Sequence, residues 1–163
     1  MFAAASVRQD SKPLIYEELL AQARSLFEGE REALANSANL AALLYHALPE
    51  LNWAGFYWMK GGELVLGTFQ GKPACVRIAL GKGVCGSAAS ARETILVRDV
   101  EAFPGHIACD SASRSEIVVP IIRADRVLGV LDLDSPVLSR FDAEDQRGLE
   151  AIVAAFIAST DLG

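Results

Sequence analysis

The chain of 163 residues contains three cysteines, Cys75, Cys85 and Cys109, which are its most reactive side chains. Each lies beside glycine, proline or small polar residues, whereas a buried structural cysteine usually lies inside an apolar run. Such neighbours are typical of turns and loops, where functional groups are often carried. The pattern therefore favours thiol chemistry, with incidental reduced thiols as the alternative.

A thiol with an ordinary pKa is mostly protonated at neutral pH, so a nucleophilic cysteine needs a cation or a helix N-terminus nearby. Cys85 begins a helix expected over residues 83–92 and is the strongest candidate by this criterion. Cys109 has His106 three residues before it and Arg114 five residues after it. Local sequence alone therefore does not decide which thiol attacks.

A metal site is the rival use of three thiols. The cysteines are too widely spaced for the Cys-x2–4-Cys pattern of zinc sites, and only His106-x-x-Cys109 has the short spacing of a ligand pair. The sequence therefore predicts no metal and no cofactor.

Three acidic residues form a second candidate group. Asp132 and Asp134 are two positions apart on an expected strand, so their side chains lie on the same face. A hairpin turn at residues 124–125 would place Glu116 beside them on the neighbouring strand. Carboxylates at close range raise at least one pKa, and a retained proton would make a general acid. The alternative is a solvated strand end that leads into the turn Asp134-Ser135-Pro136.

Trp53 and Tyr57 lie on one face of a strand expected over residues 52–60. Aromatic residues in this arrangement pack in a core or form the wall of a small-molecule site, and both interpretations stay open.

Hydrophobic periodicity and turn residues predict the elements that must position these groups. A loop without periodicity covers residues 101–115, and loops of this length are usually functional. We expect one α+β domain over residues 1–163, with a central, mostly antiparallel sheet and the N- and C-terminal helices packed on one face. Helices are expected over residues 13–27, 32–48, 83–92 and 142–160, and strands over 52–60, 63–69, 76–80, 94–97, 116–123 and 126–134.

Composition excludes several partners. A net charge of −6 with scattered lysines and arginines opposes nucleic-acid binding. No apolar run approaches the roughly 18 residues of a membrane span. The odd number of cysteines and the lack of an export-signal pattern in residues 1–10 predict a cytoplasmic protein.

Several motifs together resemble the free methionine-(R)-sulfoxide reductases, which are single-domain enzymes with the GAF fold. The resemblance extends from about Ile15 to Ile157. All three cysteines occur at the spacing of that family, whereas most GAF domains are sensory modules without this trio. The motifs are Asn52–Tyr57, Phe69–Cys75, Gly81–Gly86, His106–Ser113, Ser115–Pro120 and Gly129–Ser135.

The resemblance implies reduction of free methionine (R)-sulfoxide to methionine. It assigns Cys109 as the attacking thiol, against the helix-dipole argument for Cys85, and Cys75 as the resolving thiol. Cys85 becomes an auxiliary thiol that can also pair with Cys75. A sulfenic acid on Cys109 would condense with Cys75 to a disulfide, which thioredoxin would reduce. A homodimer is plausible from the same resemblance.

In the family pattern the residues matching Glu116, Asp132 and Asp134 line the pocket. We expect Glu116 and Asp134 to share the proton that polarises the S–O bond and Asp132 to attract the substrate ammonium. Trp53 and Tyr57 would enclose the thioether, and a pocket closed by residues 101–115 would exclude peptides. The alternatives are a non-catalytic GAF module that binds a small molecule or senses oxidants, and a peroxide-reducing thiol enzyme.

Overall fold

The computed structural model describes residues 11–107 and 109–163. The segment 1–10, interpreted above as lacking an export signal, and residue 108 of the long loop lie outside the described residues. In chain order the elements are α1 (Lys12–Phe27), α2 (Ala33–Ala47), β1 (Trp53–Lys60), β2 (Glu63–Gly71), β3 (Arg77–Ala79), α3 (Gly83–Ala91), β4 (Ile95–Val97), a 3-10 turn (Val100–Ala102), β5 (Ser115–Arg123), β6 (Arg126–Ser135) and α4 (Ala143–Ser159).

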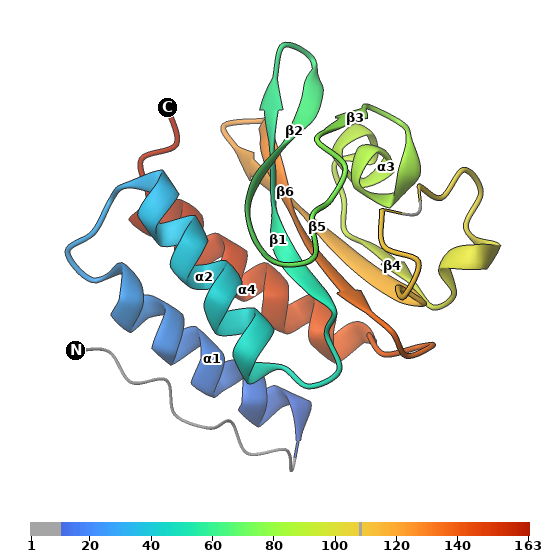
Figure 1. Ribbon diagram of the computed structural model, residues 1–163. Coiled ribbons are helices and arrows are strands. Elements are labelled where there is room, and N and C mark those ends of the chain that lie inside the picture. Colours follow the sequence, from blue (N-terminus) through green and yellow to red (C-terminus); the bar gives the residue numbers. More distant parts are fainter. Residues whose placement is uncertain (1–10, 108) are drawn as a thin grey trace.

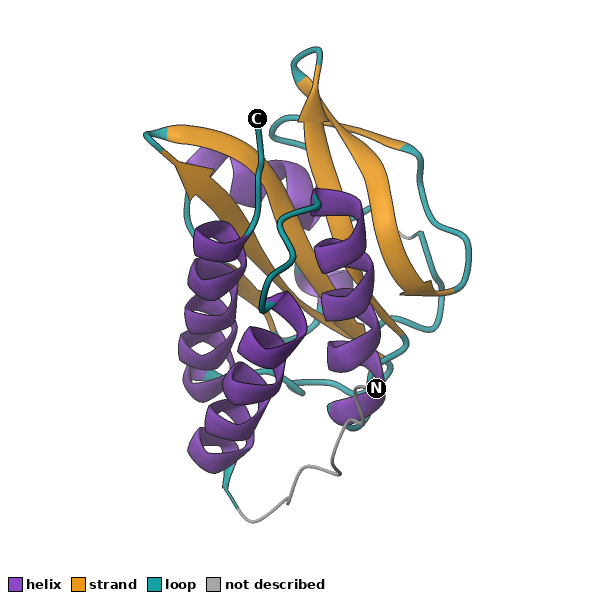
Figure 2. Ribbon diagram, turned by 90° about the vertical axis from the view of Figure 1, so that its left-hand side faces the viewer, coloured by secondary structure: helices purple, strands orange, loops and turns teal. Residues whose placement is uncertain are grey.

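The strands of the described residues form one six-stranded sheet in the order β3-β2-β1-β6-β5-β4 (Figure 1). Every neighbouring pair in this sheet is antiparallel. The α1, α2 and α4 helices lie side by side across one face of the sheet, and α3 lies on the other (Figure 2). The predicted α+β class, with the terminal helices on one face, is confirmed.

Local sequence explains both long hairpins. Gly61 and Gly62 connect β1 to β2, and both have positive φ angles, as a type I′ hairpin turn requires. Ala124 and Asp125 connect β5 to β6 with the same sign of φ. The second turn places Glu116 near residues 132–134, as the sequence predicted. The exact pairing also depends on an irregularity between Ile121 and Ile122, which shifts the register by one residue and brings Glu116 opposite Asp134.

Strand alternation divides the core between the two faces of the sheet. Over residues 117–121 of β5 and 130–133 of β6, the odd-numbered residues pack against α1, α2 and α4, as Ile117 and Leu133 do. The even-numbered hydrophobic residues of the same stretches face α3, as Val118 and Val130 do. The same two strands therefore support the helical layer on one side and a second, smaller cluster on the other. Within the described residues, no helix is long and apolar enough to cross a membrane.

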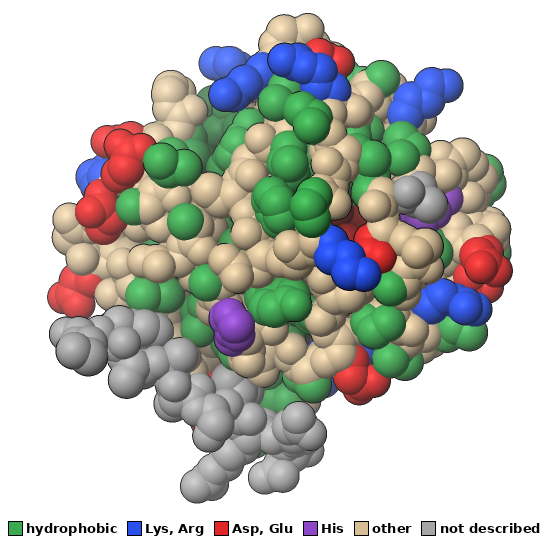
Figure 3. Space-filling view, viewed as in Figure 1, with side chains coloured by type: hydrophobic (Ala, Val, Ile, Leu, Met, Phe, Trp, Pro, Cys, Tyr) green, Lys and Arg blue, Asp and Glu red, His purple; other side chains and the backbone are tan. Residues whose placement is uncertain are grey.

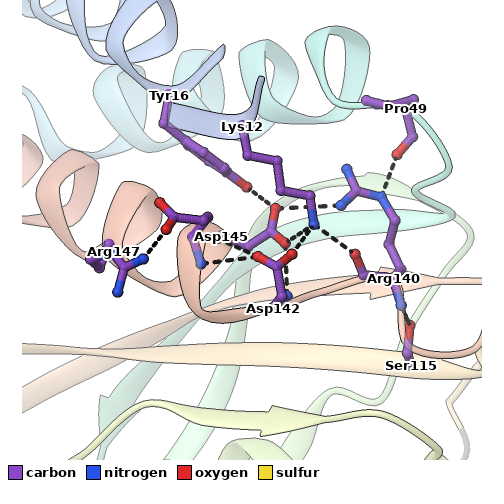
Figure 4. Close-up of polar contacts among 9 residues, drawn as sticks. Lys12, Tyr16, Pro49, Ser115, Arg140, Asp142, Asp145 and Arg147 are labelled. Atoms are coloured by element: carbon purple, nitrogen blue, oxygen red, sulfur yellow. Dashed lines mark hydrogen bonds and ion pairs between the residues drawn. The ribbon is translucent and has the colours of Figure 1, made fainter. Parts of the chain in front are cut away.

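A buried polar network joins the helical layer to the loop before α4 (Figure 4). Asp145 is completely buried and accepts hydrogen bonds from the Tyr16 hydroxyl at 2.7 Å and the Lys12 Nζ at 2.6 Å. It also forms the capping box of α4 with Asp142. Arg140 donates to Asp145 and to the carbonyl oxygen of Pro49. One carboxylate thus fixes α1, α4 and the segment before β1.

The pKa values in this network follow from its geometry. Burial alone would lower the pKa of Lys12, but its hydrogen bonds to Asp145 and Asp142 outweigh burial and raise it. Burial and the negative charge of Asp145 both raise the pKa of Tyr16. Lys12 is therefore held charged and Tyr16 neutral, as the contacts with Asp145 require.

We expect Asp145→Asn to lower the free energy of unfolding by about 2–4 kcal/mol, because Lys12 and Arg140 lose their buried counter-charge. The control is Glu144→Gln, the same chemical change one residue earlier, on a half-exposed side chain paired with Arg147. It should cost less than about 0.5 kcal/mol. Urea unfolding of both variants gives the two values, and similar losses would contradict the assigned role of Asp145.

Candidate active site

The three predicted carboxylates meet at one end of the sheet. Glu116 pairs with Asp134 across the β5–β6 ladder, and Asp132 lies two residues from Asp134 on the same face. Their exposed fractions are 5% for Glu116, 9% for Asp134 and 6% for Asp132. The alternative of a solvated strand end is therefore wrong, because α3 and the two cysteine-bearing loops cover this end of the sheet.

Burial determines the charge of these carboxyl groups. It is the largest influence on Glu116 and, together with the nearby Asp134, raises the pKa of Glu116 to about 8. Burial and the neighbouring carboxylates also raise the pKa values of Asp132 and Asp134 well above their ordinary range. The cluster therefore retains protons at neutral pH, as the sequence analysis predicted for at least one member.

Cys85 contacts this cluster from α3. Its Sγ lies 4.0 Å from Oε1 of Glu116, and the residue is only 4% exposed. Burial, followed by the charges of Asp132 and Glu116, raises its pKa well above the ordinary value. The prediction that the helix N-terminus would activate Cys85 is wrong, because loss of hydration and nearby negative charge outweigh the dipole. Cys85 also belongs to a core cluster, although its neighbours in sequence are not those of a typical structural cysteine.

The other two cysteines are joined in a disulfide, Cys75–Cys109, with their Cα atoms 5.6 Å apart. Cys75 lies in the loop between β2 and β3, and Cys109 lies in the long loop before β5. The Cys109 side chain lines the same cavity as Glu116 and Asp134. The third cysteine, Cys85, is a free thiol. The structure thus brings together a disulfide and an acidic cluster.

Trp53 and Tyr57 form one wall of the cavity, on the same face of β1 as predicted. Their rings stack with centroids 5.9 Å apart. Gly55 lies between them, and a Cβ at this position would come within 2.7 Å of the Trp53 ring. This glycine, which the sequence analysis did not identify, leaves the space that the indole occupies.

The polar atoms of these two aromatic rings bind the loop that carries Cys75. The Trp53 Nε1 donates to the carbonyl oxygen of Lys72 at 3.1 Å. The Tyr57 hydroxyl donates to the carbonyl oxygen of Cys75 at 2.9 Å. The aromatic wall therefore also holds one of the two disulfide-forming residues in place.

The loop that carries Cys109 is anchored by Asn52. Its Nδ2 donates to Oδ2 of Asp110 at 3.1 Å and to Oγ of Ser113 at 3.0 Å. Asp110 also accepts from the backbone N–H of Ala112. Sequence reasoning missed this anchor, because Asn52 and Asp110 are 58 positions apart and nothing in the two motifs that contain them indicates that they meet.

The cavity enclosed by these groups has a volume of about 40 Å³ in the disulfide-linked protein. This is room for only about three water-sized groups. The face seen in Figure 3 is hollowed beside basic side chains, with acidic atoms inside the hollow. Lys72 and Lys82 are exposed and line the opening.

His106 is a further polar group at the cavity. Its Nε2 lies 3.6 Å from Oε2 of Glu116, and its side chain is 15% exposed. Burial lowers the pKa of His106, which favours the neutral ring at neutral pH. The sequence pattern identified this histidine as a cation near Cys109 and as a weak metal-ligand candidate, and the structure shows that it also contacts Glu116.

Comparison with known proteins shows which family the chain belongs to. Residues 35–156 match the GAF domain family model. The chain is 48% identical to the free methionine-R-sulfoxide reductase of Escherichia coli, and the match covers 93% of both chains. The chain belongs to the free methionine-R-sulfoxide reductase family.

Solved structures of reductase family members have the same fold. The X-ray structure of free methionine-R-sulfoxide reductase from Neisseria meningitidis, in complex with its substrate, is 43% identical, with a TM-score of 0.93. That match covers 98% of this chain and 95% of the other. A putative GAF sensor protein from Burkholderia vietnamiensis is 62% identical, with a TM-score of 0.89, over 92% of this chain and 96% of the other.

The raised pKa of Glu116 predicts how stability depends on pH. Between the ordinary pKa of 4.5 and about 8, the folded protein keeps a proton that the unfolded chain has lost. Stability from this group is therefore complete below pH 4.5 and is lost as the pH rises toward 8. We expect wild type to lose about 1–3 kcal/mol more than Glu116→Gln between pH 5 and pH 8 in urea unfolding.

The control for this measurement is Glu17→Gln, which removes a carboxylate from an exposed position on α1. It should follow the wild-type pH dependence. Parallel curves for wild type and Glu116→Gln would show that Glu116 does not hold its proton in the folded state.

Proposed function

We propose that this protein reduces the (R)-sulfoxide of free methionine to methionine, with Cys109 as the attacking thiol. The observation that carries the proposal is that Cys109 lines a cavity in which the pKa of Glu116 is raised to about 8. Attack by a thiolate on sulfur requires protonation of the sulfoxide oxygen, and a carboxylic acid that stays protonated at neutral pH can supply that proton. The identity to named reductases supports the same assignment.

The first step transfers the oxygen atom from substrate sulfur to Cys109. The thiolate attacks the sulfoxide sulfur while Glu116 and Asp134, paired across the ladder, share the proton donated to the oxygen. Methionine leaves with its sulfur reduced by two electrons, and Cys109 is oxidised to a sulfenic acid. His106, 3.6 Å from Glu116, contacts the group that must regain a proton for the next turnover.

The second step forms the Cys75–Cys109 disulfide and releases water. Cys75 attacks the sulfenic acid, and the resulting bond is the one that the structure contains. The cavity left in this state, about 40 Å³, is too small for an amino acid. Methionine therefore leaves before the disulfide closes, and an external dithiol must reopen it before substrate enters. Thioredoxin is the reductant that we assign to this step.

Recognition of a free amino acid is assigned to Asp132 and the aromatic wall. One oxygen of Asp132 is buried and has no hydrogen-bond partner within the described part of the chain. A substrate ammonium would bind this oxygen and favour its ionised form. Trp53 and Tyr57 would enclose the thioether methyl group. A methionine sulfoxide inside a peptide lacks this ammonium group and has chain on both sides that the small cavity would not accommodate.

The remaining assignments belong to the same proposal. The single GAF-like domain acts alone as the catalytic unit, without a metal or cofactor, in the cytoplasm, and a homodimer is the assembly that the family resemblance favours. Cys85, whose buried thiol contacts Glu116, is an auxiliary thiol that we do not place in the first disulfide.

Assays with racemic free methionine sulfoxide and dithiothreitol test the thiol roles. Wild type should consume only the R isomer, and Cys109→Ser should consume neither, because the attacking thiol is missing. With thioredoxin as reductant, Cys75→Ser should release about one methionine per chain and then stop. Cys85→Ser should keep this first turnover.

Chiral separation of the remaining sulfoxide and quantification of methionine give these values. Binding of the sulfoxide by wild type without turnover would instead support the sensory alternative that the Burkholderia relative's name suggests. Peroxide consumption at matching rates would support a peroxide-reducing enzyme.

The role of Asp132 predicts a change in substrate preference. Wild type should reduce free methionine (R)-sulfoxide at least about 100-fold more efficiently, in kcat/KM, than the N-acetyl derivative, which has no ammonium. Asp132→Asn should shrink this ratio by about tenfold or more, mainly by losing activity on the free amino acid. An unchanged ratio in the variant would place ammonium recognition elsewhere.

A further inference from the structure

Three side chains with metal-binding atoms meet in the cavity from three different elements. Cys85 comes from α3, Glu116 from β5 and Asp132 from β6, and their ligand atoms all lie within 4.8 Å of one another. All three residues are buried. They are far apart in sequence, so the spacing argument that disfavoured a zinc site could not detect this group.

Two further observations point to a ligand at this place. Asp132 lines the cavity, and one of its oxygens is buried without a hydrogen-bond partner among the described residues. His106 lines the same cavity, with its Nε2 3.6 Å from Oε2 of Glu116; it lies outside the group of three ligand residues and would have to move toward an ion to act as a fourth donor. A buried oxygen without a hydrogen bond is costly, and a cation would remove that cost.

The donor set selects the class of ion. A thiol, an imidazole and carboxylates are the ligands that Zn²⁺ takes in proteins, whereas Mg²⁺ and Ca²⁺ prefer oxygen alone. In a tetrahedral zinc site the donor atoms lie about 3.3–3.8 Å apart. The longest distances between the three ligand atoms, up to 4.8 Å, would therefore have to shorten by about 1 Å around an ion.

The disulfide-linked state suits an ion better than an amino acid. Its cavity, of about 40 Å³, has room for an ion and a water molecule. In this state Cys75 and Cys109 are bonded to each other, so Cys85 is the cysteine left to bind metal. The opening beside Lys72 and Lys82 provides an entry path.

We propose that the disulfide-linked protein binds one Zn²⁺ through Cys85, Glu116 and Asp132, with His106 as the fourth ligand. The ion is a reversible ligand of the oxidised state and has no part in the sulfoxide chemistry. It occupies the space next to Glu116 and Asp132 that the substrate would need. This site goes beyond the proposed reductase activity and does not depend on it.

The test uses the full chain in its disulfide form, without thiol reagents. Titration calorimetry with Zn²⁺ should give one ion per chain, and Zn²⁺ should raise the thermal unfolding midpoint. With Co²⁺ in place of Zn²⁺, absorption spectra should show a sulfur-to-cobalt charge-transfer band and the d–d bands of a tetrahedral site. These readouts need no turnover, so they are independent of whether the protein proves to be a reductase.

Variants assign the ligands. Cys85→Ser, which is close in size, should lose the charge-transfer band and weaken Zn²⁺ binding at least about 100-fold. His106→Ala should weaken binding about tenfold or more. His46→Ala is the matched control, because it removes the other histidine of the chain from an exposed position on α2 and should change nothing. Circular dichroism confirms that each variant folds.

Two outcomes would overturn the proposal. One is the absence of a charge-transfer band in wild type together with no stoichiometric uptake of Zn²⁺. The other is binding that Cys85→Ser leaves unchanged, or that His46→Ala weakens as much as His106→Ala, since such an ion is adventitious. Asp132→Asn provides an independent check, because it keeps the thiol but should also weaken Zn²⁺ binding at least tenfold.

Discussion

Burial of three carboxyl groups in one cavity is the constraint on which the rest of the structure depends. Glu116, Asp132 and Asp134 cannot all ionise there, so the cluster stores protons that a solvated strand end would have released. Keeping such groups dry costs stability, and the apolar layer on the opposite face of the sheet offsets that cost. The helices on the far face therefore supply the stability that the buried carboxyl groups cost. The Asp145 network fixes two of these helices, α1 and α4, to each other.

Rigid and movable parts have separate chemical tasks. The acids lie on paired strands, where the register fixes their distances, as with Glu116 opposite Asp134. Cys75 and Cys109 lie on loops, where a side chain can change partner between substrate, sulfenic acid and disulfide, as the proposed mechanism requires. A proton donor needs a constant position and an unusual pKa, whereas a thiol that reacts twice needs freedom to turn. The division between strands and loops meets both needs.

The sequence predicted what short-range patterns determine. Alternation and the turn at residues 124–125 placed Glu116 near Asp132 and Asp134, and periodicity placed the helices, but the register shift at Ile121 that pairs Glu116 with Asp134 was not predicted. Patterns could not predict burial. Cys85 begins a helix, but the strands beneath it set its pKa. Contacts between segments far apart in sequence could not be predicted either, because no local preference encodes them. The hydrogen bond from Asn52 to Asp110 is an example. The pairing of Cys75 with Cys109 came from family resemblance, since spacing alone left the pairing open.

The hydrogen bonds from Trp53 and Tyr57 to the Cys75 loop link pocket shape to recycling. In the proposed mechanism, a smaller residue at either position would widen the pocket for a bulkier sulfoxide, but it would also release the segment that brings the sulfur of Cys75 to Cys109. Variants with smaller residues at Trp53 or Tyr57, made to accept bulkier substrates, would thus complete a first turnover but form the Cys75–Cys109 disulfide slowly. Divergence toward new sulfoxides would have to start from another side of the pocket.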